Sequence, residues 1–91
     1  MQDTPTKTAA RMLRLNPKDN VLIAVDTVEQ GAGAEGVAAT LRIPRGHKMA
    51  TAKITKGQPV FKFGQIIGHA SEDILPGAQI QTHNCGTAAF G

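Results

Sequence analysis

The sequence predicts a compact all-β domain of short, curled strands with little helix. The apolar runs are short and rich in β-branched residues, and no apolar pattern with a 3.6-residue period extends along the 91 residues. An aliphatic residue stands three positions before a glycine in residues 28–31, 54–57 and 74–77. A glycine at this point suits a turn that needs a positive φ, so each unit is interpreted as the same kind of bend between strands.

The first two strands are predicted at residues 11–16 and 20–26, where apolar and β-branched residues predominate. Residues 17–20 contain Pro, Asp and Asn, which favour a turn. The two strands are therefore expected to form a hairpin. The run at 20–26 is apolar enough to be buried on both faces.

Three glycines at positions 31, 33 and 36 follow, and they raise the question of a phosphate-binding loop. The spacing of a dinucleotide fingerprint is absent, and no Gly-Lys-Ser/Thr follows. The next run, residues 37–43, is rich in β-branched residues, whereas a phosphate site needs a helix N-terminus. Residues 31–36 are therefore predicted to be a flexible hairpin loop.

Later strands are predicted at residues 59–63, 66–70 and 78–84. The domain is placed at residues 11–84, and the polar segment 1–10 and the small-residue segment 85–91 are interpreted as flexible tails.

Composition excludes several classes of function. The chain is 41% apolar but has no Trp or Tyr, so its single core must be aliphatic. Four of the ten basic residues lie before position 19 with no aromatic between them, which argues against nucleic-acid binding. No apolar run approaches the ~20 residues that span a bilayer, and no secretory leader is recognisable. With one cysteine, Cys85, no intrachain disulfide is possible, and a cytoplasmic protein without a membrane partner is predicted.

The best candidate site is the segment at residues 44–50, interpreted as a tight corner between two strands. Arg45, His47 and Lys48 place two cations and an imidazole at one point. The expected partner is the segment containing His83 and Asn84, where a titratable side chain that can act as a ligand stands beside an amide and the thiol of Cys85.

Each of these residues also has a structural interpretation. A histidine in a turn beside Arg and Lys is often a solvated surface group, and His83 with Asn84 can simply end a strand. His69 lies on a short apolar strand, where a structural role is expected. Cys85 lies two residues from His83 without a third orienting group, which argues against a nucleophile and base pair.

Five short motifs in order resemble those of the N-terminal domain of the altronate and galactarate dehydratase family. They are Arg45-Gly46-His47-Lys48, Ile54-x-x-Gly57, Lys62-Phe63-Gly64 with Ile67-Gly68, Asp73-Ile74-x-x-Gly77, and His83-Asn84. In that family this piece is an SAF-type domain of β-clip fold, fused ahead of a large catalytic region or present as a separate small subunit. Two positions depart from the pattern, since Gln81 stands where a histidine is typical and Phe63 where a tyrosine is typical.

The resemblance implies a component of a carbon-oxygen lyase that dehydrates a sugar acid and completes the active site of a larger catalytic subunit or domain. It implies that His47 and His83 act as acid and base or as metal ligands, and that Arg45, Lys48 and Asn84 bind substrate. The cofactor implied is iron or a similar divalent metal, held mainly by the catalytic partner. Two histidines do not make a complete metal shell, so the isolated chain is expected to be inactive.

Two alternatives remain open at this point. One is the small subunit of a sulfolactate sulfo-lyase, and the other is a non-catalytic SAF module that binds carbohydrate or only stabilises a catalytic subunit. Activity that survives His47→Ala would favour the second alternative.

Overall fold

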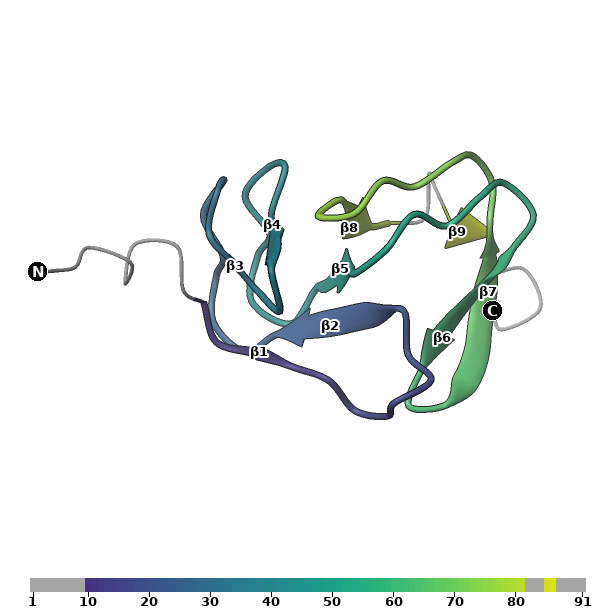
Figure 1. The fold of residues 1–91 in the computed structure, drawn as a ribbon, viewed down its shortest axis with the longest axis horizontal. Coiled ribbons are helices and arrows are strands. Elements are labelled where there is room, and N and C mark those ends of the chain that lie inside the picture. Colours follow the sequence, from purple (N-terminus) through teal and green to yellow (C-terminus); the bar gives the residue numbers. More distant parts are fainter. Residues whose placement is uncertain (1–9, 82–84, 87–91) are drawn as a thin grey trace, which may run out of the picture.

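A computed structural model describes residues 10–81 and 85–86, and this part of the chain is all-β with no helix (Figure 1). Its strands are β1 (Met12–Leu13), β2 (Val21–Ala24), β3 (Gly33–Ala34), β4 (Val37–Ala38), β5 (Lys48–Ala50), β6 (Pro59–Lys62), β7 (Gln65–Ala70), β8 (Gln79–Ile80) and β9 (Cys85–Gly86). The predicted fold class of short, curled strands is confirmed. Within these ranges there is also no helix long and apolar enough to cross a membrane.

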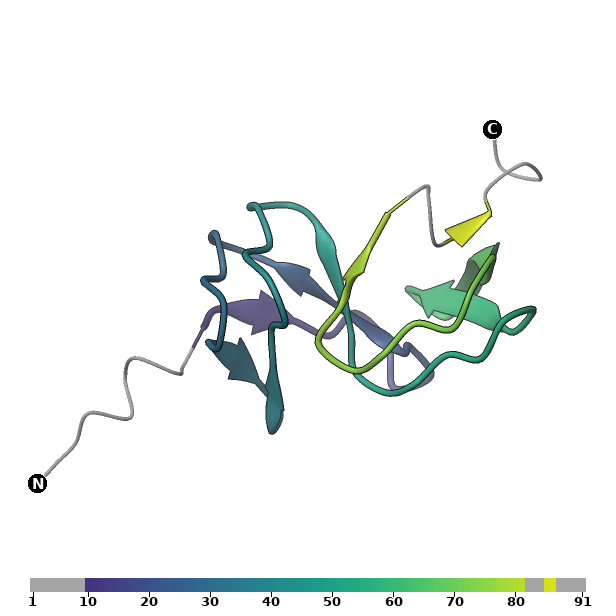
Figure 2. The same ribbon diagram turned by 90° about the horizontal axis from the view of Figure 1, so that it is seen from above.

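The strands form three small antiparallel sheets. A four-stranded sheet has the order β1-β2-β5-β8, a three-stranded sheet has the order β6-β7-β9, and β3 pairs with β4 alone. The predicted hairpin of the first two strands is confirmed, with Met12 opposite Ala24. Strand β9 pairs with the end of β7, so Cys85 and Gly86 form a strand in a segment that was interpreted as a tail. The β3–β4 and β6–β7 hairpins lie at opposite ends of the long axis (Figure 2).

Two aliphatic clusters form the core, one on each face of the central sheet. Val21 of β2 and Ala50 of β5 belong to the first cluster. Their neighbours Leu22 and Met49 belong to the second cluster. The first cluster consists of Val21, Ala50, Ile54, Val60, Ala70, Ile74 and Ile80, and the second of Leu22, Ala24, Val28, Ala32, Ala39, Ile43 and Met49. Because successive residues of a strand face opposite sides, β2 is buried on both, as predicted.

The predicted repeat of aliphatic residue and glycine is a real structural unit, and it occurs four times. Besides residues 28–31, 54–57 and 74–77, the same turn is formed by residues 43–46, which the sequence interpretation did not include. In each copy the glycine has a φ between 85° and 91°, and the next residue donates its N–H across the turn, as in a type II turn. The copies pair through their aliphatic residues, Val28 with Ile43 and Ile54 with Ile74.

Both two-residue hairpins carry a non-glycine residue in the left-handed region. Glu35 has a φ of 54° and Phe63 a φ of 58°, and each precedes a glycine that also has a positive φ. Positive φ at both central residues is typical of the type I′ turn, which matches the twist of the flanking strands. The segment at residues 31–36 is therefore not a loop throughout, because it contains β3 and the tip of a tight hairpin.

Candidate functional site

The turn of residues 44–47 carries two of the predicted site residues, Arg45 and His47. The N–H of His47 bonds to the carbonyl of Pro44 at 3.0 Å, and the N–H of Gly46 bonds to the carbonyl of Ala24 at 2.8 Å. The turn is thus tied to β2 by its backbone, while the side chains of Arg45 and His47 are exposed. This arrangement holds a cation and an imidazole at the surface on a backbone with little freedom to move.

His47 has a defined partner in Gln79 of β8, whose Nε2 lies 2.9 Å from His47 Nδ1. An amide can donate through its nitrogen or accept through its oxygen, so Gln79 can serve either tautomer of the ring. The hydrogen bond orients the ring and leaves Nε2 as the atom available for proton transfer. The sequence interpretation missed Gln79, because the two residues come together only through the pairing of β5 with β8.

Arg45 lies near an ion pair at the same end of the sheet. Arg11 Nε contacts Asp26 Oδ2 at 2.6 Å. The hydrogen bond from Arg11 lowers the pKa of Asp26, and the charges of Arg11 and Arg45 lower this pKa further. Asp26 is therefore ionised at neutral pH and offsets part of the positive charge near Arg45.

Lys48 departs from the predicted corner, because residues 48–50 form strand β5 between β2 and β8. Met49 is buried in one core cluster and Ala50 in the other, so Lys48 shares the face of Ala50. Its side chain is half-buried. Lys48 and Met49 thus face opposite sides of the sheet, and Lys48 is not part of the exposed turn.

A surface pocket of about 420 Å³ has Gln79, the hydrogen-bond partner of His47, in its lining. It is lined by residues 40–42, 72–75, 78, 79 and 81. Gly77, which lies between the lining residues Leu75 and Ala78, leaves no room for a side chain, because an added Cβ would lie 2.0 Å from the carbonyl oxygen of Ala38. Two leucines at the pocket, Leu41 and Leu75, are 69% and 57% exposed. The pocket therefore combines apolar and polar surface of both charges, and its lining residue Gln79 orients the imidazole of His47.

His83 and Asn84 lie outside the described residues. Within residues 10–81 and 85–86 there is no group of three or more His, Cys, Asp or Glu side chains that would hold a metal ion. The described residues therefore do not supply a complete metal shell. His69 is exposed on β7, opposite Pro59 and Gly86.

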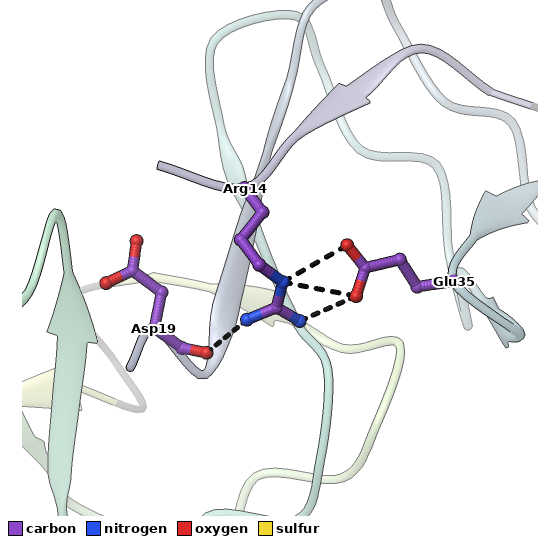
Figure 3. Close-up of polar contacts among 3 residues, drawn as sticks. All are labelled: Arg14, Asp19 and Glu35. Carbon is purple, nitrogen blue, oxygen red and sulfur yellow. Dashed lines mark hydrogen bonds and ion pairs between the residues drawn. The ribbon is translucent and has the colours of Figure 1, made fainter. Parts of the chain in front are cut away.

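A polar network away from His47 links the two hairpin tips, and Figure 3 shows the part formed by Arg14, Glu35 and Asp19. The guanidinium of Arg14 contacts the carboxylate of Glu35 through Nε and Nη2, with a shortest distance of 2.6 Å, and Nη1 donates to the backbone carbonyl of Asp19. The Asp19 carboxylate points away from Arg14. It accepts the N–H groups of Phe63 and Gly64 at 2.8 and 2.7 Å.

This network was not predicted from the sequence. Two local signals were present, since Glu35-Gly36 and Phe63-Gly64 each place a glycine second between short alternating runs. The partner that holds Phe63 is 44 residues away, and no local pattern identifies it. Asp19 itself is 5% exposed, the one acidic or basic residue among the buried residues that the structure describes.

Comparison with known proteins gives one family and several relatives. Residues 10–88 match the family model described as the altronate/galactarate dehydratase SAF domain. The chain is similar to altronate dehydratase of Bacillus subtilis, 38% identical over 79 residues, and to altronate dehydratase of Escherichia coli, 35% identical over 79 residues. Each match covers 82% of this chain and 16% of the relative. The chain is also 37% identical over 51 residues to (2R)-sulfolactate sulfo-lyase subunit alpha of Paracoccus pantotrophus, which covers 56% of this chain and 76% of that protein.

Proposed function

Because the chain belongs to the altronate/galactarate dehydratase SAF domain family, we propose that it completes the active site of a sugar-acid hydro-lyase whose catalytic body is a larger polypeptide. It serves as a small subunit or as an N-terminal domain of that enzyme. The observation that carries the proposal is the family match over residues 10–88. The chain spans 16% of the length of the altronate dehydratases it matches, so most of such an enzyme lies outside it.

The proposed role of His47 is proton transfer. Dehydration of a sugar acid requires removal of a proton beside the carboxylate, stabilisation of the resulting enediolate and protonation of the departing hydroxyl. An imidazole titrates near neutral pH, and the exposed ring of His47 is oriented through Nδ1 by Gln79 at 2.9 Å. Its Nε2 is the atom that gives or takes the proton, and His83 is proposed as the second histidine of the site.

Arg45 is the proposed contact for the substrate carboxylate. Its guanidinium is exposed one residue beyond Pro44, on the same anchored turn as His47. A planar guanidinium forms two parallel hydrogen bonds with a carboxylate, which fixes the orientation of the acid. Asn84 is proposed as a further substrate contact. Lys48 is proposed only as a more distant positive charge, because it lies on β5 and not on the turn.

The divalent metal is assigned to the catalytic polypeptide. When bound there, the metal ion would act as a Lewis acid that assists the departure of the hydroxyl. No set of ligands for it exists among the described residues. The isolated chain is therefore proposed to be inactive, and activity is expected only in the complex or in the full enzyme.

A second candidate is the small subunit of a sulfo-lyase acting on sulfolactate. The observation that favours it is the similarity to a relative named as a subunit, of which the chain covers 76%. Both reactions expel a group next to a carbon that has lost a proton, so the same turn serves either. They differ in whether the leaving group is hydroxide or sulfite.

The test is purification of the chain, with whatever polypeptide it is part of or bound to, from its native source. The preparation is assayed for loss of altronate, galactarate and sulfolactate, with and without added Fe(II). Dehydration of altronate or galactarate supports the first candidate, and release of sulfite supports the second. Binding of these acids without turnover would overturn both and indicate a non-catalytic carbohydrate-binding module.

A further inference from the structure

The tip of the β6–β7 hairpin presents an exposed aromatic ring in an unfavourable backbone conformation. Phe63 is 67% exposed and has a φ of 58°. A bulky residue rarely adopts this region, and asparagine or glycine is the usual choice at the first central position of such a turn. Phe63 thus weakens the turn and remains mostly exposed in the described part of the domain. Strain of this kind at an exposed residue indicates a role outside the domain.

The rest of the chain holds this tip rigidly in place. The buried carboxylate of Asp19 accepts the N–H groups of Phe63 and Gly64, one on each oxygen. The neighbouring Asn20 side chain donates to the carbonyl of Pro59 at 3.1 Å and accepts the N–H of Phe61 at 2.8 Å. Four hydrogen bonds from two adjacent side chains therefore fix the hairpin against the turn at residues 17–20. A preformed tip loses little conformational entropy when it binds.

The residues around the ring have the character of a protein-binding anchor. Ile66, three residues further along the hairpin, is 40% exposed. Lys62 precedes Phe63 and the exposed Lys18 precedes Asp19, so two cations lie one residue from the hydrogen bond that holds the tip. An aromatic side chain with polar residues around it is the usual form of an interface hot spot.

We infer that Phe63 anchors this domain to the catalytic dehydratase polypeptide by entering an apolar pocket with carboxylates at its rim. This inference rests on the proposed function for the existence of that polypeptide. Two observations support this partner: the matched relatives carry most of their length outside this domain, and the charged residues beside the tip, Lys18 and Lys62, are both positive. Carboxylates at the rim would complement Lys18 and Lys62 and steer the association.

The experiment replaces Phe63 with the photoreactive residue p-benzoylphenylalanine in the protein as its native host makes it. After irradiation, crosslinked peptides are identified by mass spectrometry. The matched control carries the same residue in place of Leu13, which is 51% exposed on β1. The expected result is a crosslink from position 63, and not from position 13, to an Asp- and Glu-containing segment of a dehydratase polypeptide.

Three outcomes would overturn the inference. They are crosslinks from position 63 only to a second copy of this chain, crosslinks to the dehydratase from position 13 but not from 63, and no crosslink at all from position 63. If dehydratase activity still co-purifies in these cases, the proposed function stands and only the docking site is wrong. If no such activity is present, the proposed function fails first.

Two substitutions separate docking from folding. Phe63→Asn gives the preferred sequence of the turn, so its urea midpoint should not fall below that of the wild type. Its association with the dehydratase polypeptide should nevertheless weaken at least tenfold. Phe63→Tyr keeps the ring and should associate within threefold of the wild type. Wild-type association of Phe63→Asn would contradict an anchoring role for the ring.

Discussion

Asp19 is expected to be one of the most important polar residues for the stability of this domain. Its replacement by alanine tests whether its carboxylate holds the β6–β7 turn in place. The side chain is 5% exposed, and both carboxylate oxygens accept backbone N–H groups of the β6–β7 turn. In Asp19→Ala, the N–H groups of Phe63 and Gly64 lose these acceptors. The turn then keeps its unfavourable φ at Phe63 without the interaction that offsets it.

The magnitude follows from the two hydrogen bonds. A buried donor left without a partner costs about 1–3 kcal/mol, and the lower part of that range applies because Phe63 is exposed and water can reach the turn. Two such donors give a loss of about 2–4 kcal/mol in the free energy of unfolding for Asp19→Ala. Asp19→Asn keeps one acceptor oxygen and should lose about half as much.

The assay is equilibrium urea unfolding of the wild type and both variants, with Asp26→Ala as the control. Asp26 is an acidic residue in a solvent-exposed ion pair, and such pairs contribute little to stability. The expected order of stability is wild type, Asp19→Asn, Asp19→Ala, with Asp26→Ala close to the wild type. A loss below about 0.5 kcal/mol for Asp19→Ala, or a loss no larger than that of Asp26→Ala, would show that the Asp19 carboxylate does not stabilise the β6–β7 turn.

Three further predictions concern turn geometry, pH and the orientation of His47. Gly57→Ala and Gly77→Ala both place alanine at a φ near 90°, but only the new Cβ at position 77 meets backbone. In urea unfolding, Gly77→Ala should therefore be less stable than Gly57→Ala by about 1–3 kcal/mol. Equal losses of stability would mean that Gly77 is not packed against Ala38. The hydrogen bond from Arg14 lowers the pKa of Glu35 below its ordinary 4.5. The stability advantage of the wild type over Glu35→Gln should therefore be present above pH 4.5 and disappear as the pH falls through the lowered pKa. A stability difference that does not change between pH 7 and pH 3 would contradict this ion pair. Gln79→Leu removes the hydrogen bond to His47 Nδ1 and should lower kcat of the catalytic complex about tenfold, with the urea midpoint as a control for folding.

The parts of the fold that could be predicted are those set by local sequence. The spacing of an aliphatic residue and a glycine determines each turn by itself, which is why the bends at residues 28–31, 54–57 and 74–77 are confirmed. The same spacing at Ile43 and Gly46 was overlooked, because residues 44–50 had been interpreted as a functional corner. The pairing of Val28 with Ile43 and of Ile54 with Ile74 is set by the curled sheets and has no local signal.

Several strands are shorter than predicted, although β7, Gln65–Ala70, begins one residue before the predicted 66–70. The predicted strand at residues 20–26 is observed as β2, Val21–Ala24, and the predicted strand at 78–84 contains β8, Gln79–Ile80. The apolar run at residues 37–43 contains only β4, Val37–Ala38, before the chain turns toward the bridge at Ile43. In a strongly curled domain each strand pairs for only a few residues before the next turn, so an apolar run exceeds the paired segment. At Lys48 the difference is the reverse. Residues 44–50 were interpreted as a corner between strands because of their polar residues, but residues 48–50 form the short central strand β5.

For the candidate site, the sequence indicated the residue types but not their arrangement. Arg45 and His47 share one anchored turn because they are two residues apart. The partner of His47 in the described structure is Gln79, 32 residues away, which becomes its neighbour only through the register of β5 and β8. The importance of Phe63 was also hidden, because a positive φ at phenylalanine cannot be inferred from composition.

The most direct test of the proposed function is kcat for altronate or galactarate dehydration by the complete enzyme carrying His47→Ala. His69→Ala is the matched control, since both histidines are exposed and only His47 is proposed to transfer a proton. Loss of general acid–base catalysis predicts a decrease in kcat of about 10²–10⁴-fold for His47→Ala, with His69→Ala near the wild type. Equal activity of the two variants, both close to the wild type, would contradict the account and reduce this domain to a structural module of the enzyme.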